Sequence, residues 1–138
     1  MERITVYIGW ADKNYSAYTD DFERIGGTII STGKTLESVK SEFLSALQFH
    51  IEGCMQDGDK LHEWFVNGNY KIDFKLETSA LLHSFDGILT RSALSRITGI
   101  NERQIGHYAT GLRKPRIKQR EKIILGFHKI GKELSAVL

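Results

Sequence analysis

The amino-acid sequence predicts an α+β domain followed by an all-α domain, and two observations support this. Several segments of the first half alternate apolar and polar residues with a period of two, the pattern of half-buried strands. From Thr78 onward the apolar residues recur at three- and four-residue steps, the pattern of helices. We therefore expect an antiparallel β-β-β-α-β domain over residues 1–77 and a helical domain over residues 78–138.

Four strands are expected in the first domain, over residues 3–10, 15–19, 28–32 and 70–76. In the first of them, alternate residues from Ile4 to Trp10 are apolar and should share one face. Between the third and fourth strands, apolar residues at helical spacing predict a single helix. Thr35 stands at its N-cap position, and Gly53 is a plausible end.

Four short helices are expected in the second domain, each with a recognisable start. Thr78 and Ser79 can cap the first, and Thr90 can cap the second, which runs from residue 91 to about 98. Asn101 begins the third, with Gln104 placed as its capping-box partner. The last begins at about residue 116, directly after the only proline of the chain.

The net charge of +2 is divided unevenly along the chain. Residues 1–77 hold eight Lys/Arg and thirteen Asp/Glu, a net charge of −5, whereas residues 78–138 hold eleven and four, a net charge of +7. This division suggests two modules with different partners, the basic one facing a polyanion such as a nucleic acid. The alternative is a chance clustering of solvated basic residues.

Several other classes of protein and site are disfavoured. A single cysteine, Cys54, excludes an internal disulfide, and the five histidines show no metal-ligand spacing. We expect no metal, no cofactor and no enzymatic activity. No N-terminal apolar run is long enough for a signal peptide or a membrane span, so a cytoplasmic location and no membrane contact are expected.

The sequence argues against a phosphate-binding loop and against a two-metal nuclease. Gly33-Lys34-Thr35 resembles the end of a phosphate-binding loop, but Thr28 occupies the place of its first glycine, and a strand pattern lies between. The acidic residues Asp12, Asp20, Asp21 and Glu23 invite a two-metal nuclease, but they fall on hairpin loops, where solvated acids are common.

Residues 91–110 meet the geometric requirements of a helix-turn-helix. The crossing of two short helices needs a small residue in the first helix, and Ser95 occupies that position. The turn needs a left-handed residue, which Gly99 can supply without steric penalty. The buried side of the pair would consist of Leu94, Ile100, Ile105 and Tyr108.

The second helix of this motif would present a polar face made of Asn101, Glu102, Arg103, Gly106, His107 and Thr110. Arginine, asparagine and glutamine pair bidentately with guanine or adenine edges, and glutamate can accept from cytosine. A basic loop follows at residues 111–116 and suits phosphate contacts. The residues expected to contact DNA are Thr90, Arg91, Ser92, Asn101, Glu102, Arg103, Gln104, His107, Thr110, Arg113, Lys114 and Arg116.

Two family resemblances follow from these features. The four helices, the glycine turn and the Gly111-Leu112-Arg113-Lys114-Pro115 loop resemble phage-repressor-like DNA-binding domains. The expected β-β-β-α-β order, with an acidic hairpin region and the segment from Gly33 to Val39, resembles the HicB family of antitoxins. HicB sequences usually carry a proline before the third strand, and residues 21–27 contain none.

The HicB resemblance implies an antitoxin that represses its own operon. It also implies that the acidic domain binds a basic, messenger-RNA-cleaving HicA-like toxin. The candidate contacts to this toxin are Asp12, Asp20, Asp21 and Glu23. Two alternatives stay open: a stand-alone regulator whose first domain senses a ligand or dimerises, and an RNA-binding regulator. The lack of a stacking aromatic platform in the basic half argues against RNA.

A homodimer or a higher even oligomer is expected, because one recognition helix reads few base pairs. The last helix is one candidate interface, since Ile123, Phe127, Ile130 and Leu134 form a stripe. Packing of this stripe on its own domain is the equal alternative.

Overall fold

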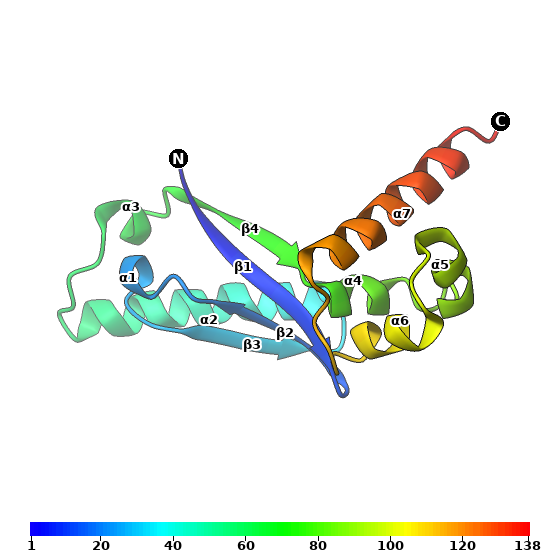
Figure 1. Cartoon of the computed structure of the whole chain (residues 1–138). Helices are drawn as coiled ribbons and strands as arrows, with labels where there is room; N and C mark the ends of the chain where they lie inside the picture. The colour runs from blue at the N-terminus through cyan, green and yellow to red at the C-terminus, as the bar shows by residue number, and fades with distance from the viewer. The chain divides into compact units, whose positions relative to one another are not determined.

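The computed structural model describes residues 1–138, and the chain divides into two compact units, Met1–Glu77 and Thr78–Leu138. The first contains the strands and three helices, and the second contains four helices. Figure 1 shows the elements of both units along the chain. No helix in the chain combines the length and the apolar character that a membrane-spanning helix requires.

The first unit is an α+β fold built on one four-stranded sheet in the order β3-β2-β1-β4. The strands are β1 (Glu2–Ala11), β2 (Asn14–Thr19), β3 (Ile29–Gly33) and β4 (Tyr70–Leu76), within two residues of the predicted ranges. β1, β2 and β3 are antiparallel, but β4 pairs with β1 in parallel. The prediction of a purely antiparallel sheet was therefore wrong.

The parallel pairing follows from the long helix between β3 and β4. α2 (Leu36–Gln56) has 21 residues and runs back along the sheet for about 32 Å. The chain therefore returns to the end of the sheet at which β1 and β3 begin. A strand that starts from there runs in the same direction as β1, and a helical crossover is the usual connection of this kind.

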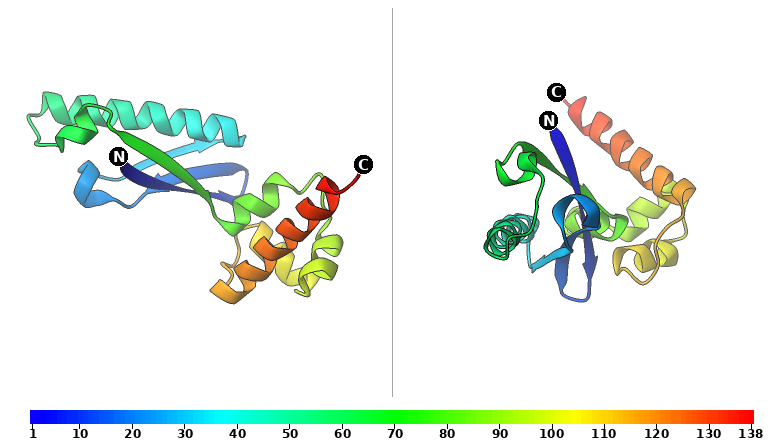
Figure 2. Two further views of the ribbon diagram at one scale, coloured as in Figure 1. Left: turned by 90° about the horizontal axis from the view of Figure 1, so that it is seen from above. Right: turned by 90° about the vertical axis from the view of Figure 1, so that its left-hand side faces the viewer.

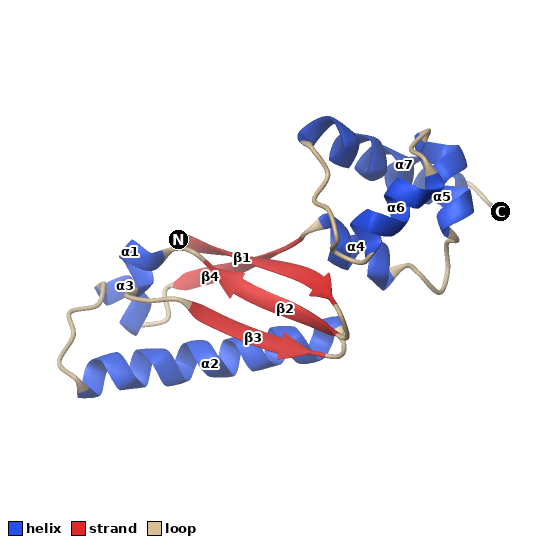
Figure 3. Ribbon diagram, turned by 60° about the horizontal axis from the view of Figure 1, so that its bottom comes forward, coloured by secondary structure: helices blue, strands red, loops and turns tan.

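One face of the sheet and α2 enclose the core of the first unit (Figures 2 and 3). Ile4, Val6 and Ile8 are completely buried, as the alternation in β1 predicts. α2 contributes a buried row at helical spacing, and the ring of Phe43 in that row lies edge-on to Phe74 of β4. The other buried members of the row are Val39, Leu47, Ile51 and Cys54.

The start of α2 was predicted correctly and its end was not. Thr35 accepts a hydrogen bond from the Ser38 amide, and the Ser38 side chain accepts one from the Thr35 amide, which completes a capping box. The helix continues through Gly53 to Gln56. Gly53 costs the helix about 1 kcal/mol relative to alanine, which is too little to end a helix whose buried row extends to Cys54.

Two short helices were not predicted: α1 (Phe22–Ile25) and α3 (Glu63–Val66). They lie at the same end of the sheet, where the guanidinium of Arg24 lies 5.4 Å from the ring centroid of Trp64. Each buries one side chain completely, Ile25 in α1 and Phe65 in α3. A single turn of helix is too short to show a helical period in the sequence.

The sheet face opposite α2 carries a coupled pair of side chains. The Tyr18 hydroxyl donates a 2.5 Å hydrogen bond to a Glu77 carboxylate oxygen. This bond and partial burial raise the pKa of Tyr18 to about 12. Tyr7 lies beside Tyr18, with the ring centroids 5.6 Å apart. The hydrogen bond between Tyr18 and Glu77 therefore ties Glu77, which follows β4, to the inner strand β2.

The second unit consists of α4 (Thr78–Ser84), α5 (Arg91–Thr98), α6 (Glu102–Ala109) and α7 (Ile117–Ser135). Its core is formed by Leu82, Leu94, Ile100, Ile105, Tyr108, Ala109 and Ile123. Gly126 of α7 is buried where α7 crosses α5, and a Cβ there would lie 3.1 Å from a Thr98 methyl and 3.2 Å from an Ile97 methyl. The glycine therefore allows a close crossing.

The apolar stripe of α7 is divided between two environments. Ile123 is completely buried in the core of its own unit, and Phe127 packs against that core and the ring of Phe85. Leu134, near the end of the helix, is 67% exposed. The first half of the stripe therefore packs within its own unit, which was one of the two alternatives.

Candidate nucleic-acid interface

α5 and α6 are joined by a short turn whose geometry is that predicted. Gly99 follows the last residue of α5 with φ of 75°, the left-handed conformation, and its amide donates to the Ser95 carbonyl. The Ser95 hydroxyl donates a 2.6 Å hydrogen bond to the Ile100 carbonyl on the far side of the turn. The small side chain at position 95 thus both fits the crossing and ties the turn to α5.

The interior of the turn is the apolar set expected from the sequence. Ile100 is 4% exposed, Ile105 is completely buried, and Leu94 and Tyr108 are 3% exposed. These side chains hold one face of α6 against α4 and α5. The core beneath α6 therefore fixes the direction in which the other face of this helix points.

Side-chain caps define where both helices begin. Thr90 accepts a 3.0 Å hydrogen bond from the Ala93 amide, and the Asn101 side-chain oxygen accepts a 2.8 Å bond from the Arg103 amide. Gln104 is not the capping-box partner that we predicted. Its side-chain amide instead donates to the Tyr108 hydroxyl at 2.9 Å. The buried tyrosine needs a partner for its hydroxyl, and the glutamine one turn before it supplies one.

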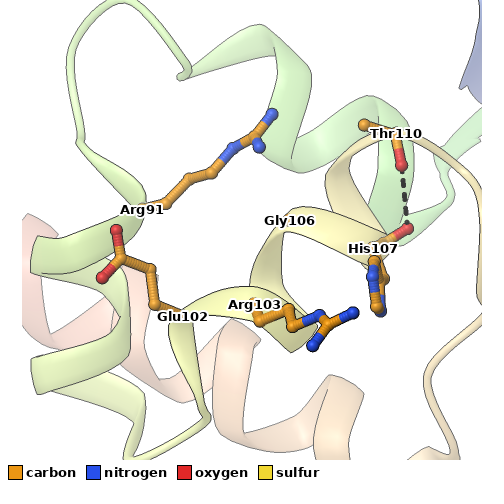
Figure 4. Close-up of a pocket in the computed structure, with 6 residues that line it drawn as sticks. All are labelled: Arg91, Glu102, Arg103, Gly106, His107 and Thr110. Carbon is orange, nitrogen blue, oxygen red and sulfur yellow. Dashed lines mark hydrogen bonds between the residues drawn. The ribbon is translucent and has the colours of Figure 1, made fainter.

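The outward face of α6 lines an open groove together with the start of α5 (Figure 4). Its lining residues are Arg91, Glu102, Arg103, Gly106, His107 and Thr110. All but Gly106 are among the residues predicted to contact DNA, and the prediction had placed Gly106 on the same face. Residues from the two helices are thus brought together by the fold.

Gly106 lies beside the Arg91 side chain in this groove. A Cβ at this position would lie 3.2 Å from a terminal nitrogen of Arg91, a close contact that the exposed end of the arginine can relieve by a small shift. The sequence had assigned no role to this glycine. A glycine in the middle of an eight-residue helix is unfavourable by about 1 kcal/mol, and that cost was the available signal of a close approach.

Charge and polarity in the groove are mixed. The groove is lined by two arginines and one glutamate, and the only ion pair of Arg91 is a long one, 4.0 Å, to Asp86. The Nδ1 atom of His107 is buried with no hydrogen-bond partner. The Thr110 hydroxyl donates to the His107 carbonyl at 3.3 Å. Such a surface offers both hydrogen-bond donors and acceptors, which is what reading a base edge requires.

The basic loop is attached directly to the end of α6. Gly111 has φ of 79°, which turns the chain, and the Arg113 amide then donates to the His107 carbonyl at 3.2 Å. The side chains of Arg113, Lys114 and Arg116 are exposed. Exposed cations beside a groove-lining helix suit contacts to phosphates.

The remaining residues predicted to contact DNA are placed differently. Ser92 is exposed in the first turn of α5, while Thr90 and Asn101 use side-chain oxygens to cap helices. Gln104 is partly buried and bonded to Tyr108. None of these four lines the groove.

The four acidic residues predicted to bind a toxin do not form one cluster. Asp12 lies at the β1–β2 turn with φ of 57°, whereas Asp20 follows the other end of β2. A six-residue strand separates the two ends by about 20 Å. Asp21 is partly buried and paired with Arg24, and Glu23 is exposed. Asp12, Asp20 and Glu23 are exposed, and of these only Asp20 and Glu23 lie at the same end of β2.

No group of three or more histidine, cysteine, aspartate or glutamate residues is arranged to hold a metal ion. No family model, curated protein or solved structure matches the chain.

Proposed function

We propose that this chain is a sequence-specific DNA-binding protein of the helix-turn-helix type that represses transcription by occupying an operator. α6 would be the recognition helix. The observation that carries the proposal is the outward face of α6, where base-reading residue types line a groove while the opposite face is held by the core. An α-helix with its side chains is about 10–12 Å in diameter and the major groove is about 12 Å wide, so α6 can enter it.

Different residues would have different roles in this complex. Arg103 lies on the outward face near the start of α6, the part of a recognition helix that contacts base edges. Arg113, Lys114 and Arg116 lie on the loop that follows α6 and would contact phosphates. The net charge of +7 on residues 78–138 supports this through attraction of the polyanion.

The proposal is tested by selecting duplexes from a random library with the full chain and then measuring fluorescence anisotropy. The selected duplex and a scrambled duplex are compared at about 50 and 200 mM salt. We expect the selected duplex to bind at least ~10³-fold more tightly than the scrambled one. Equal and steeply salt-dependent binding to both duplexes would mean non-specific polyanion binding, and absence of binding would reject the proposal.

A matched pair of variants locates the contact on α6. Arg103→Ala should weaken binding of the selected duplex by about 1–3 kcal/mol. Arg96→Ala is the control, because Arg96 is an exposed arginine in the last turn of α5 that does not line the groove. Equal losses for the two variants would show that total charge, and not the face of α6, determines binding.

We also propose that the first unit binds a basic protein partner, as the HicB resemblance suggests. Its net charge of −5 and the exposed pair Asp20 and Glu23 support this, because opposite charge accelerates encounter and excludes wrong partners. Co-expression with the product of the neighbouring gene tests the proposal. Failure to co-purify would favour the alternative, a stand-alone regulator whose first unit senses a ligand or dimerises.

A further inference from the structure

The charged side chains of the groove are not paired with one another. Glu102 and Arg103 are the first two residues of α6, and both are exposed. Figure 4 shows the Glu102 carboxylate on the side of the start of α5, while Arg103 extends to the other side. Glu102 makes no ion pair and no side-chain hydrogen bond, although Arg91 and Arg103 line the same groove. Its carboxylate is therefore open to an external partner.

A free carboxylate in this position opposes the binding of a polyanion. Residues 78–138 carry a net charge of +7, and of their four acidic residues only Glu102 lines the groove. The phosphates of any duplex repel this carboxylate, which lowers the affinity for all sequences. An acidic residue that lowers affinity in general can still raise specificity, because specificity is a difference between two affinities and is often increased by unfavourable contacts with the wrong partner.

Base edges in the major groove differ in whether they can donate a hydrogen bond to a carboxylate. Cytosine N4 and adenine N6 are amino groups that donate, whereas guanine O6 and N7 and thymine O4 only accept. A carboxylate against an amino group forms a charge-assisted hydrogen bond. Against an accepting edge the same carboxylate is removed from water and left without a partner, which is costly. A glutamate that faces the groove thus separates the four bases into two classes.

We propose that Glu102 is a specificity-determining residue of the groove: it accepts a hydrogen bond from the amino group of a cytosine or an adenine, and it excludes guanine and thymine from that position. This inference rests on the proposed role of α6 as the recognition helix. Arg103, the next residue, is a donor that suits guanine O6 and N7. Consecutive Cα atoms are about 3.8 Å apart and successive base pairs about 3.4 Å, so the two contacts should fall on the same or on adjacent base pairs. The predicted half-site therefore contains a guanine that is paired with, or next to, the base with the amino group.

The test compares the base preferences of the full wild-type chain and of the variant Glu102→Ala. Both are titrated with duplexes that carry each of the four bases at each position of the site selected by the wild type. At one position the wild type should prefer cytosine or adenine by about 10–100-fold over guanine and thymine. Glu102→Ala should reduce this preference to within about 3-fold, chiefly because it binds the guanine and thymine duplexes more tightly. Arg103→Ala should instead weaken binding of the selected duplex, so the two variants have opposite signs.

Glu121→Ala is the matched control for charge. Glu121 is an exposed acidic residue of α7 that does not line the groove, so its removal changes the net charge by the same amount. This variant should strengthen binding to all duplexes alike. A role of Glu102 in stabilising the start of α6 through the helix dipole would also affect all four bases alike, because it acts on the helix and not on a base. Only a contact with a base gives an effect that depends on the base.

Removal of the amino group from the DNA identifies the contact directly. A duplex with 2-pyrimidinone in place of the cytosine, or purine in place of the adenine, lacks only that group. The wild type should bind this duplex at least about 10-fold more weakly than the parent duplex, whereas Glu102→Ala should lose much less. The comparison with Glu102→Ala corrects for any effect of the analogue on the duplex itself. Circular dichroism checks that each variant is folded.

Three results would overturn the inference: a wild-type preference for guanine or thymine at the position that Glu102→Ala alters, equal effects of Glu102→Ala on all four bases, or an equal loss in both chains when the amino group is removed. Each of these results includes specific binding of a duplex, so the proposed function would stand. Failure to select any duplex would instead reject the proposed function and this inference together.

Discussion

The left-handed turn at Gly99 gives the sharpest test of how α6 is positioned. Gly99 has φ of 75°, and a Cβ built there meets no atom within 4 Å. Gly99→Ala therefore introduces no collision, and its cost is the backbone strain of a left-handed alanine, about 1–2 kcal/mol. Gly99→Asn should recover part of this cost, because asparagine tolerates the left-handed region better than other residues do.

Gly131→Ala provides the matched control. Gly131 lies inside α7, and a Cβ there also meets no atom within 4 Å. Its backbone is helical, so alanine should stabilise the unit by about 0.5–1 kcal/mol. The same chemical change should thus have opposite signs at the two positions, and only the conformation of the backbone differs.

The assay is hydrogen exchange of the buried amides of α5 and α6, which reports the free energy of opening of this unit. Gly99→Ala should accelerate the exchange of the Leu94 and Ile105 amides by about 5–30-fold, and Gly131→Ala should slow it. Unchanged exchange in Gly99→Ala would refute the left-handed turn. Faster exchange in both variants would show that the sign does not depend on the backbone conformation.

Three further results are expected. Arg113→Ala should weaken binding to all duplexes alike and reduce the salt slope by about 0.9, whereas Arg103→Ala should relax specificity at one position; identical behaviour in a competition binding assay would contradict the two roles. Because the pKa of Tyr18 is raised to about 12, its contribution to stability is complete below pH 10 and is lost as the pH rises from 10 to 12. Tyr18→Phe should remove that step from a urea-unfolding series measured against pH, while a step of undiminished size in the variant would assign it to other tyrosines. Ile105→Ala, at a completely buried site, should cost about 2–5 kcal/mol in the same assay, and a cost below 1 kcal/mol would mean that the site collapses around the alanine.

The turn between α5 and α6 could be predicted because each of its requirements is local. A small residue at 95, a glycine at 99 and an apolar residue at 100 lie within one short segment, and each choice is set by sterics between near neighbours. The outward face of α6 then followed from its period. The role of Gln104 did not follow, because its partner was decided by the burial of Tyr108.

The direction of β4 depends on the whole unit, and so a strand-by-strand interpretation missed it. The alternation over Tyr70–Leu76 identifies a strand but carries no information about its neighbour. The chain reverses its direction at each of the two antiparallel connections, again into α2, and again after it. Counting these reversals would have given a β4 that runs parallel to β1. The separation of Asp12 from Asp20 is another case, since closeness in sequence across a six-residue strand means distance in space.

The parallel pairing of β1 with β4 has a consequence for the order of folding. β1 and β2 join through a tight hairpin, but Glu2 finds its partner only at Tyr70. Contacts between distant parts of a chain form late, because closing the intervening loop costs entropy before any contact forms. During synthesis, the edge of β1 that pairs with β4 must therefore stay unpaired until nearly the whole first unit has left the ribosome. The four helices of the second unit have no such delay, and we expect its refolding phase to be the faster of the two.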